Sequence, residues 1–310
     1  MTPDRAQLVE HARQSIAHGS KSFAMASKLF DPATRDRAWL LYAWCRGCDD
    51  LADGQEMGHG MQIVADPAAR LATIRARTAL ALAGQPSGDP AFDGFGLVAR
   101  ECGIPAAVAE DLIEGFALDA AGWRPQTEQD LYQYCYHVAG TVGVMMAIVM
   151  GVSPDDEATL DRACDLGLAF QLANIARDVR EDHDAGRRYL PLDWLKELKI
   201  PESELFAPPY RKRLASLGAR LAERSAAYEA SARVGAAALP FRSAWAVLAA
   251  AGIYGDIARE VSRRGTTAWD TRVATSKTAK LGWVVKSWWQ ARRPKKGLPR
   301  PPGLWTRPRR

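Results

Sequence analysis

Residues 160–182 read LDRACDLGLAFQLANIARDVRED and predict a long helix. Apolar side chains recur there at the i, i+3, i+4 and i+7 positions, and alanine is frequent. The same pattern runs through most of the chain, and we find no strictly alternating apolar and polar run bounded by Asn-Gly or Asp-Gly. Breakers with proline or glycine separate the helical segments. We therefore expect an all-α, single-domain fold. The expected helices are 33–53, 67–84, 105–121, 127–150, 155–182, 209–237 and 241–264.

Within the opening stretch, oxygen-bearing side chains follow one side of the predicted helix. Asn174, Asp178 and Asp182 recur every four residues, and Gln171 lies one turn earlier on the same side. Arg177 is three residues after Asn174. Oxygen ligands without histidine or cysteine suit a hard cation such as Mg²⁺. Since Mg²⁺ often shares its shell between a few carboxylates and a bound phosphate, the stripe is a candidate Mg²⁺–phosphate site.

A second acidic cluster occurs in 42–53, which reads YAWCRGCDDLAD. Asp49 and Asp53 share a helical face, where like charges repel unless a cation lies between them. Arg46 is three residues before Asp49. Each cluster alone is also typical of a solvated helix face. However, apolar sequence flanks both, and buried acids are costly unless they bind something. The two clusters together favour a Mg²⁺–diphosphate site between two helices.

The charge of the chain is unevenly distributed. Its 310 residues carry 41 Lys and Arg and 36 Asp and Glu, a net charge of +5. Twelve basic and no acidic residues fall in 271–310, which leaves 29 basic and 36 acidic residues in 1–270, a net charge of −7. We therefore divide the chain into an acidic body, 1–270, and a basic tail, 271–310.

Composition also limits the location of the protein. Five cysteines in a chain of this length do not indicate a disulfide framework, and the single Cys-x-x-Cys at Cys45 and Cys48 has no partner pair for a zinc site. The N-terminus lacks the apolar core of a signal peptide. The longest apolar run, 138–152, contains three glycines and is shorter than the ~20 residues of a spanning helix. We expect a reducing, cytoplasmic location.

The tail combines tryptophan, proline and basic residues. Trp283, Trp288, Trp289 and Trp305 occur among six Lys and Arg within 283–305. Five prolines after residue 293 predict loose order. Basic clusters are attracted to anionic lipid and tryptophan favours the membrane interface, so we expect peripheral association with a membrane surface. A merely solubilising tail is the alternative, and the acidic body disfavours nucleic-acid binding.

Together these motifs resemble the squalene/phytoene synthase family, and within it the bacterial phytoene synthases. The resemblance spans roughly 15–270 in the family's order. The matching segments are 19–23 (GSKSF), 42–53, 134–143 (YCYHVAGTVG), 160–178, 186–191 (GRRYLP) and 239–246 (LPFRSAWA).

The resemblance implies an isoprenoid-synthase helical bundle around a central apolar cavity. It implies a prenyltransferase that joins two geranylgeranyl diphosphates head to head, through prephytoene diphosphate, to phytoene, the first committed step of carotenoid biosynthesis. It also implies Mg²⁺, which Mn²⁺ can replace, no NADPH, and contact with other enzymes of the carotenoid pathway.

The family's site residues are carried over position by position. The implied metal ligands are Asp49, Asp53, Asn174, Asp178 and Asp182, of which Asp49, Asp53 and Asp178 are also the implied catalytic carboxylates. The implied substrate-binding positions are Ser20, Lys21, Ser22, Phe23, Tyr42, Arg46, Val138, Gly143, Gln171, Arg177, Tyr189 and Tyr254. Gly140 and Gly143 either leave room for a prenyl chain or allow close helix packing.

The group that removes the final proton has three candidates. Tyr134 and His137 lie in the YCYHVAGTVG motif, and the released diphosphate is itself a base. Some relatives have tyrosine at the position of His137, which is also typical of a polar core residue.

Two other functions fit the same motifs. A C30 synthase would make squalene or dehydrosqualene from farnesyl diphosphate and would differ in pocket depth. A non-catalytic member would act in assembly or lipid binding, and we would expect it to have lost the metal carboxylates.

Overall fold

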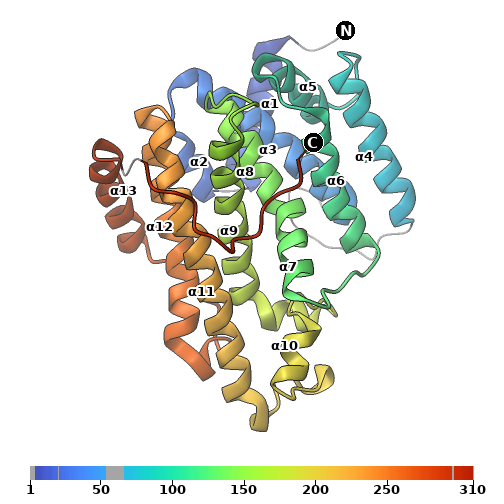
Figure 1. Cartoon of the computed structure of the whole chain (residues 1–310). Helices are drawn as coiled ribbons and strands as arrows, with labels where there is room; N and C mark the ends of the chain where they lie inside the picture. The colour runs from blue at the N-terminus through green and yellow to red at the C-terminus, as the bar shows by residue number, and fades with distance from the viewer. Residues whose placement is uncertain (1–3, 20, 54–65, 295–296, 310) are drawn as a thin grey trace. The chain divides into compact units, whose positions relative to one another are not determined.

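The computed structural model describes residues 4–19, 21–53, 66–294 and 297–309. All regular elements within these ranges are helical, so the predicted all-α class is confirmed (Figure 1). The α-helices are α1 (Arg5–Gly19), α2 (Lys21–Ser27), α3 (Pro32–Asp53), α4 (Pro67–Leu82), α5 (Pro90–Cys102), α6 (Ala106–Ala120), α7 (Glu128–Cys135), α8 (Thr141–Val149), α9 (Glu157–Asp184), α10 (Leu192–Glu197), α11 (Arg211–Gly235), α12 (Phe241–Arg264) and α13 (Lys277–Arg292). A π-helical turn, η1 (Tyr136–Gly140), joins α7 to α8, and four short 3₁₀ turns occur at η2 (Glu202–Glu204), η3 (Pro208–Tyr210), η4 (Ala236–Ala238) and η5 (Gly265–Thr267).

The predicted helices other than 127–150 begin and end within two residues of the observed ones. Their starts follow local capping chemistry. Asp66 accepts a hydrogen bond from the Ala69 amide ahead of Pro67, and Asp89 accepts one from the Ala91 amide ahead of Pro90. The second of these caps begins α5, a helix that apolar periodicity did not predict.

The segment 127–150 is helical as predicted, but its middle turn is π-helical. This turn lies against α9 at a small backbone separation. A Cβ at Gly140 would come within 2.8 Å of Cys164 Sγ, and one at Gly143 would overlap the backbone oxygen of Ala163. Of the two interpretations of these glycines, the structure supports close helix packing.

Packing divides the described chain into two compact units. The first contains residues up to 121 together with 144–160. Within it α3 packs against α1 and α5. Trp44 of α3 stacks on Phe95 of α5 with 3.8 Å between ring centroids, and its Nε1 donates to Thr78 Oγ1 at 3.3 Å. These contacts fix α3 about one turn before Asp49.

The second unit contains 122–143 and 161–309. Its α9, α11 and α12 meet at a buried cluster of Ala173, Ala222 and Ala258, whose small side chains allow close approach. Ser225 Oγ donates to the backbone oxygen of Ala169 at 2.9 Å. Trp269 Nε1 donates to the backbone oxygen of Ala176, also at 2.9 Å. These bonds fix the rotation of α9 about its axis, and with it the direction of its acidic stripe.

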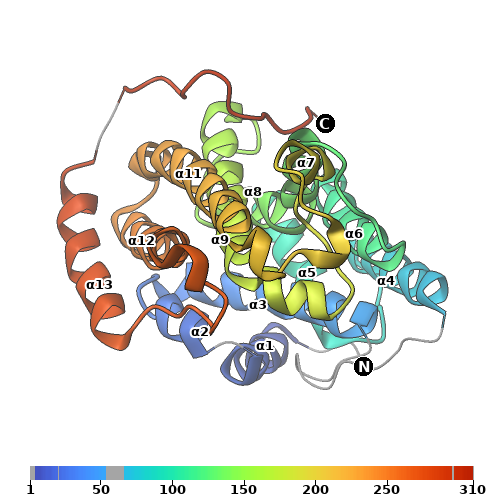
Figure 2. The same ribbon diagram turned by 90° about the horizontal axis from the view of Figure 1, so that it is seen from below.

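The residues after 270 depart from the loose order that their prolines predicted. Helix α13 lies beside α12, and the segment 297–309 runs back over α11 and α9 within the same unit (Figure 1, Figure 2). Arg300 and Arg309 from this segment make ion pairs with aspartates of α9. Composition alone could not predict this order, because the partners of the basic residues lie more than 130 positions earlier in the chain.

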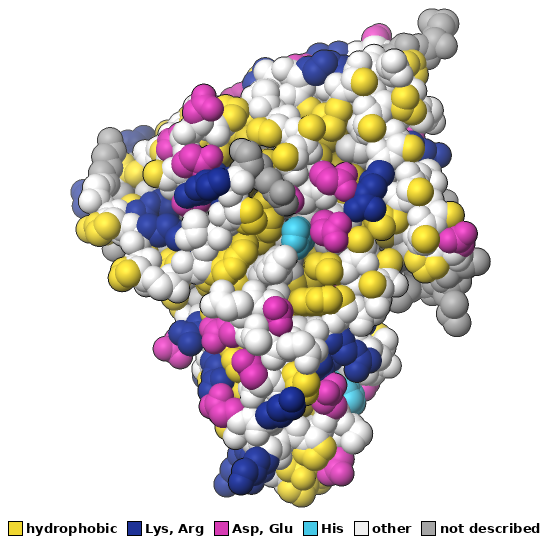
Figure 3. Space-filling model, turned by 45° about the vertical axis from the view of Figure 1, so that its right-hand side comes forward, with side chains coloured by type: hydrophobic (Ala, Val, Ile, Leu, Met, Phe, Trp, Pro, Cys, Tyr) yellow, Lys and Arg dark blue, Asp and Glu magenta, His cyan; other side chains and the backbone are white. Residues whose placement is uncertain are grey.

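The charge that is separated along the sequence is mixed on at least one face of the protein. On the face shown in Figure 3, acidic and basic side chains are interspersed. Ion pairs such as Arg272 with Asp178 and Arg300 with Asp165 join the basic tail to the acidic residues before it. Among the helices of the described ranges, none has the length and apolar character needed to cross a bilayer.

Candidate active site

The first acidic cluster lies on one face of α3, within the first unit. Arg46 Nη1 is 2.5 Å from Asp49 Oδ2, and the guanidinium carbon of Arg46 lies 5.9 Å from the Tyr42 ring centroid. Phe23 of α2 stacks on the ring of Tyr42, with 5.5 Å between the two ring centroids. The i+3 and i+4 spacing along α3 brings Tyr42, Arg46 and Asp49 together on one side of the helix.

Two polar atoms of this cluster are buried without a well-aligned hydrogen bond. Tyr42 Oη and Arg46 Nε are shielded from solvent, and although the two side chains interact with each other, neither atom makes a bond of good geometry. Burial raises the pKa of Tyr42. Burial is also the largest influence on Arg46 and opposes its charge, but Asp49, Tyr42 and Asp50 together keep the pKa of Arg46 above its usual value. Buried polar atoms with incomplete hydrogen bonding are typical of sites that take up a water or an anionic ligand.

Several predicted positions near this cluster lie outside the described residues. Ser20 is one of them, and for Lys21, Ser22 and Asp53 only the helical backbone is described. Their assignment to substrate and metal therefore stays a prediction.

The second acidic cluster lies on the C-terminal half of α9, in the second unit. Asp178 accepts a hydrogen bond from Arg177 Nε at 2.7 Å and another from Arg177 Nη2. Arg272 Nη2 lies 3.0 Å from Asp178 Oδ1, and Arg272 Nη1 lies 3.8 Å from Glu181 Oε1. Asn174 and Asp182 are half-buried, one turn to either side of Asp178. The carboxylate of Asp178 is thus held by two guanidinium groups.

Aromatic residues support this cluster from α12. Tyr254 stacks on Phe170 of α9 with 4.2 Å between centroids, beside the half-buried Gln171. Burial opposes the charge of Arg177, but Asp178 and Tyr254 favour it, so the pKa of Arg177 is raised. Arg177 therefore remains a cation in a partly dry environment, as binding of a diphosphate requires.

A stack of three aromatic rings connects α7 with the loop after α9. Tyr134 is buried between two parallel neighbours: its ring centroid is 5.5 Å from that of Trp123 and 4.8 Å from that of Tyr189. Tyr189 also lines a cavity of about 230 Å³ together with Asp182 and Arg187. The structure thus brings Tyr134, Tyr189 and the last residue of the acidic stripe into one region.

The remaining predicted positions lie on η1. His137 is buried with its ring centroid 5.2 Å from that of Tyr136, and Val138 is half-buried. The backbone oxygen of His137 accepts a hydrogen bond from Thr141 Oγ1 at 2.8 Å. π-turns are frequent at functional sites, so this geometry is compatible both with a proton acceptor and with a structural histidine.

The donor set fits a hard cation that is shared with a phosphate. Among the described residues, no group of three or more His, Cys, Asp and Glu side chains is arranged to hold a metal ion by itself. In each unit a predicted metal ligand is paired with arginine instead: Asp49 with Arg46, and Asp178 with Arg177 and Arg272. Mg²⁺ is usually bound by one or two carboxylates with phosphate oxygens completing its shell. In such a site the arginines would pair with the phosphate instead of the aspartates.

Comparison with known structures defines the class of fold. The chain matches a dehydrosqualene synthase with a TM-score of 0.82 at 24% sequence identity, over 93% of this chain and 98% of that one. It matches a squalene synthase from Alicyclobacillus acidocaldarius with a TM-score of 0.76 at 23% identity, over 84% and 95% of the two chains. The fold is that of the squalene and dehydrosqualene synthases.

Sequence comparison then places the chain in a family. Residues 16–279 match the squalene/phytoene synthase family model, and the chain belongs to this family. It is 46% identical to a 15-cis-phytoene synthase from Pantoea ananas over 97% of this chain and 98% of the relative. A phytoene synthase from Pseudescherichia vulneris gives the same identity and coverage. The family and fold that the motifs implied are confirmed.

Two residues of these clusters were not predicted from the sequence. Arg272 was grouped with the basic tail, although it pairs with Asp178. Trp123 was not among the predicted site residues, although it stacks on Tyr134. Both contacts become visible only in the folded chain. For Arg272 there was one signal, because the family model matches residues up to 279 and so includes it.

Proposed function

We propose that this chain is a phytoene synthase that condenses two geranylgeranyl diphosphates to phytoene. The observation that carries the proposal is the 46% identity with 15-cis-phytoene synthases over almost the full length of both chains. The two arginine–aspartate pairs support it, because both combine an acid for a metal with a cation for a phosphate. Residues 1–270 hold the condensing residues, to which Arg272 adds one contact.

The reaction is redox-neutral and releases two diphosphates. The C1–O bond of the first substrate breaks, the double bond of the second substrate attacks C1, and loss of a proton closes the cyclopropane ring of prephytoene diphosphate. The C–O bond of this intermediate then breaks, the cation rearranges, and loss of a second proton gives phytoene. Because no hydride is consumed, NADPH is not required.

The residues of the two clusters have distinct tasks in this proposal. Asp49, Asp53, Asn174, Asp178 and Asp182 would hold Mg²⁺, for which Mn²⁺ can substitute. Bound Mg²⁺ would neutralise charge on the diphosphate leaving groups. Arg46 and Arg177 are positioned to donate to phosphate oxygens once their aspartates bind metal, and such preorganised donors stabilise developing charge.

Further positions would bind the substrate and shield the carbocations. Phe23, Tyr42, Gln171, Tyr189 and Tyr254 offer aromatic faces or amide groups beside the two clusters, and aromatic faces attract cations. Ser20, Lys21, Ser22, Val138 and Gly143 complete the proposed substrate-binding set. Tyr134, His137 and the released diphosphate remain the candidates for the base.

We also propose that the protein works at the cytoplasmic face of a membrane, where it contacts other carotenoid-pathway enzymes. The basic residues of 271–310 and the hydrocarbon nature of the product support this location.

A substrate competition tests the proposed function. Purified protein is given equal concentrations of geranylgeranyl and farnesyl diphosphate with Mg²⁺, with and without NADPH, and the hydrocarbons are separated by mass. The proposal expects C40 phytoene in both conditions. A predominance of C30 product would replace it with a squalene or dehydrosqualene synthase.

A further inference from the structure

The outward face of α13 is apolar along its length. Leu281, Val285 and Trp289 are spaced four residues apart and expose 65%, 57% and 57% of their surface. Side chains at this spacing lie on one side of a helix. A continuous exposed apolar stripe on a single helix is unusual in a folded protein and marks a contact surface.

The opposite face of α13 is fixed against α12. Trp283 Nε1 donates to Asp256 Oδ2 at 2.5 Å, and the Trp283 ring covers Gly252 so closely that a Cβ there would overlap it. Trp245 Nε1 of α12 donates to the backbone oxygen of Val284 at 2.7 Å. Because these contacts set the rotation of α13, the stripe cannot turn inward to be buried.

Aromatic side chains enlarge the stripe at its C-terminal end. Trp288 lies edge-to-face with Trp289, with centroids 4.8 Å apart, and contacts Phe241 of α12 at 6.5 Å. Phe241 is itself 39% exposed. Arg292 stacks on Trp288 with its guanidinium carbon 4.1 Å from the ring centroid. Tryptophan beside a basic side chain is typical of the interface between lipid headgroups and acyl chains.

The charge of α13 has one sign. Lys277, Lys280, Lys286 and Arg292 lie in the helix, Arg293 follows it, and the helix contains no acidic residue. The other basic residues of the tail are used differently, since Arg300 and Arg309 pair with buried aspartates of α9. Among the described residues of the tail, Lys277, Lys286 and Arg292 of α13 make no ion pair with an acidic side chain and lie beside the apolar stripe.

We propose that the Leu281–Val285–Trp289 face of α13 docks onto an anionic phospholipid surface. This inference deepens the proposed membrane location by naming the surface that makes the contact. An apolar stripe with basic flanks has the pattern of a helix that lies in the plane of the membrane interface. The basic flanks complement anionic headgroups.

Vesicle sedimentation with the full-length protein tests this inference. The vesicles contain phosphatidylglycerol and phosphatidylcholine, or phosphatidylcholine alone. The wild type is expected to sediment with the anionic vesicles and to be released by high salt. The variant Leu281→Ser/Val285→Ser/Trp289→Ser should partition at least about tenfold less, since it loses the side chains that would insert. Lys277→Gln/Lys286→Gln should bind the anionic vesicles more weakly as well.

Two exposed apolar residues elsewhere provide matched controls. Leu80→Ser on α4 and Leu298→Ser on the C-terminal segment remove side chains that are 39% and 52% exposed, and both should bind like the wild type. Equal binding by wild type and the triple variant would overturn the inference, as would an equal loss in the Leu298→Ser control. Failure of the wild type to bind any vesicle would overturn it too.

A parallel assay separates this inference from the proposed enzyme function. The triple variant should convert geranylgeranyl diphosphate in detergent at the wild-type rate, with an unchanged circular dichroism spectrum. If the wild type binds vesicles but makes no product in detergent, the enzyme proposal fails while the docking surface stands.

Discussion

Arg272 Nη2 lies 3.0 Å from Asp178 Oδ1, so a residue at the start of the basic tail pairs with the central aspartate of the acidic stripe on α9. Arg177 holds the same carboxylate from the adjacent position. Asp178 carries a single negative charge, which one of the two arginines would balance. When Asp178 binds Mg²⁺, both guanidinium groups would become available to a diphosphate, which accepts such paired donors well.

Arg272 is therefore predicted to act on the substrate. Replacing it by glutamine should lower kcat/KM for geranylgeranyl diphosphate about 10- to 100-fold, as expected for the loss of one charge-assisted hydrogen bond. Steady-state kinetics measures the fall in kcat/KM, and thermal unfolding checks that the variant is still folded. Arg263→Gln is the matched control, because Arg263 is exposed and pairs only with Glu260. Equal kinetics in both variants would contradict a role for Arg272.

Asp178 is predicted to be required for metal-dependent turnover. Asp178→Asn keeps the size of the side chain but removes the charge that Mg²⁺ prefers, so activity should fall at least about 100-fold and need more Mg²⁺. A Mg²⁺ titration of the rate measures this. Asp155→Asn, at an exposed position just before α9, should behave like the wild type. An unchanged Mg²⁺ requirement in Asp178→Asn would remove this residue from the metal site.

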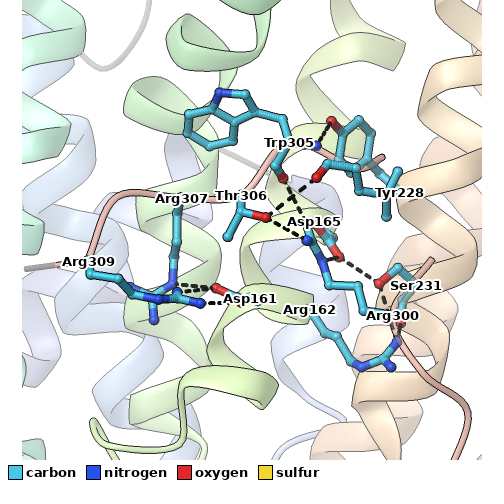
Figure 4. A network of polar contacts seen from close by, with 11 residues as sticks. Asp161, Arg162, Asp165, Tyr228, Ser231, Arg300, Trp305, Thr306, Arg307 and Arg309 are labelled. Atoms are coloured by element: carbon cyan, nitrogen blue, oxygen red, sulfur yellow. Dashed lines mark hydrogen bonds and ion pairs between the residues drawn. The ribbon is translucent and has the colours of Figure 1, made fainter. Parts of the chain in front are cut away.

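The ion pairs of the C-terminal segment are predicted to stabilise the fold (Figure 4). Arg300 makes two bonds to Asp165, at 2.9 and 2.7 Å, and the Asp165 side chain is only 1% exposed. Asp165→Asn should lower the free energy of unfolding by about 3 kcal/mol, because it leaves a poorly solvated arginine unpaired. Chemical denaturation measures the loss, and limited proteolysis should then cleave 297–309 faster.

An exposed ion pair gives the comparison for this prediction. Asp270→Asn breaks the pair with Arg211, where both side chains are about half exposed, and should cost less than about 1 kcal/mol. An equal loss of unfolding free energy in Asp165→Asn and Asp270→Asn would mean that the buried ion pair of Asp165 stabilises the fold no more than an exposed one.

The cysteines are predicted to be unreactive in the folded protein. Burial raises the pKa of Cys45 to about 12 and raises that of Cys48, Cys135 and Cys164 as well. A raised pKa keeps the thiol neutral until the pH approaches that value, so at pH 8 little of the reactive thiolate forms. Iodoacetamide labelling read by mass spectrometry should modify these residues only after denaturation. Rapid labelling of Cys45 or Cys48 in folded protein would refute this.

Local chemistry explains why so much of the fold was predictable. The bounds of α12 and α9 follow from helical periodicity and breakers, and the clusters around Asp49 and Asp178 follow from spacing along one helix. Arg272 could not be found in this way, because it lies in the non-helical stretch before α13 and its partner Asp178 lies 94 positions earlier, on α9. The contacts of Arg300 and Arg309 could not be predicted either, because a count of charged residues does not show that these arginines pair with buried aspartates of α9. Periodicity describes one helix at a time, whereas these contacts arise only when helices pack.

The central claim is that this family member makes phytoene from geranylgeranyl diphosphate without a reductant. Quantifying hydrocarbon and diphosphate together, with purified protein, Mg²⁺ and no NADPH, tests it most directly. The account predicts one C40 phytoene and two diphosphates for every two geranylgeranyl diphosphates consumed. Consumption of substrate with no C40 hydrocarbon, or a C40 product that forms only when NADPH is added, would contradict it.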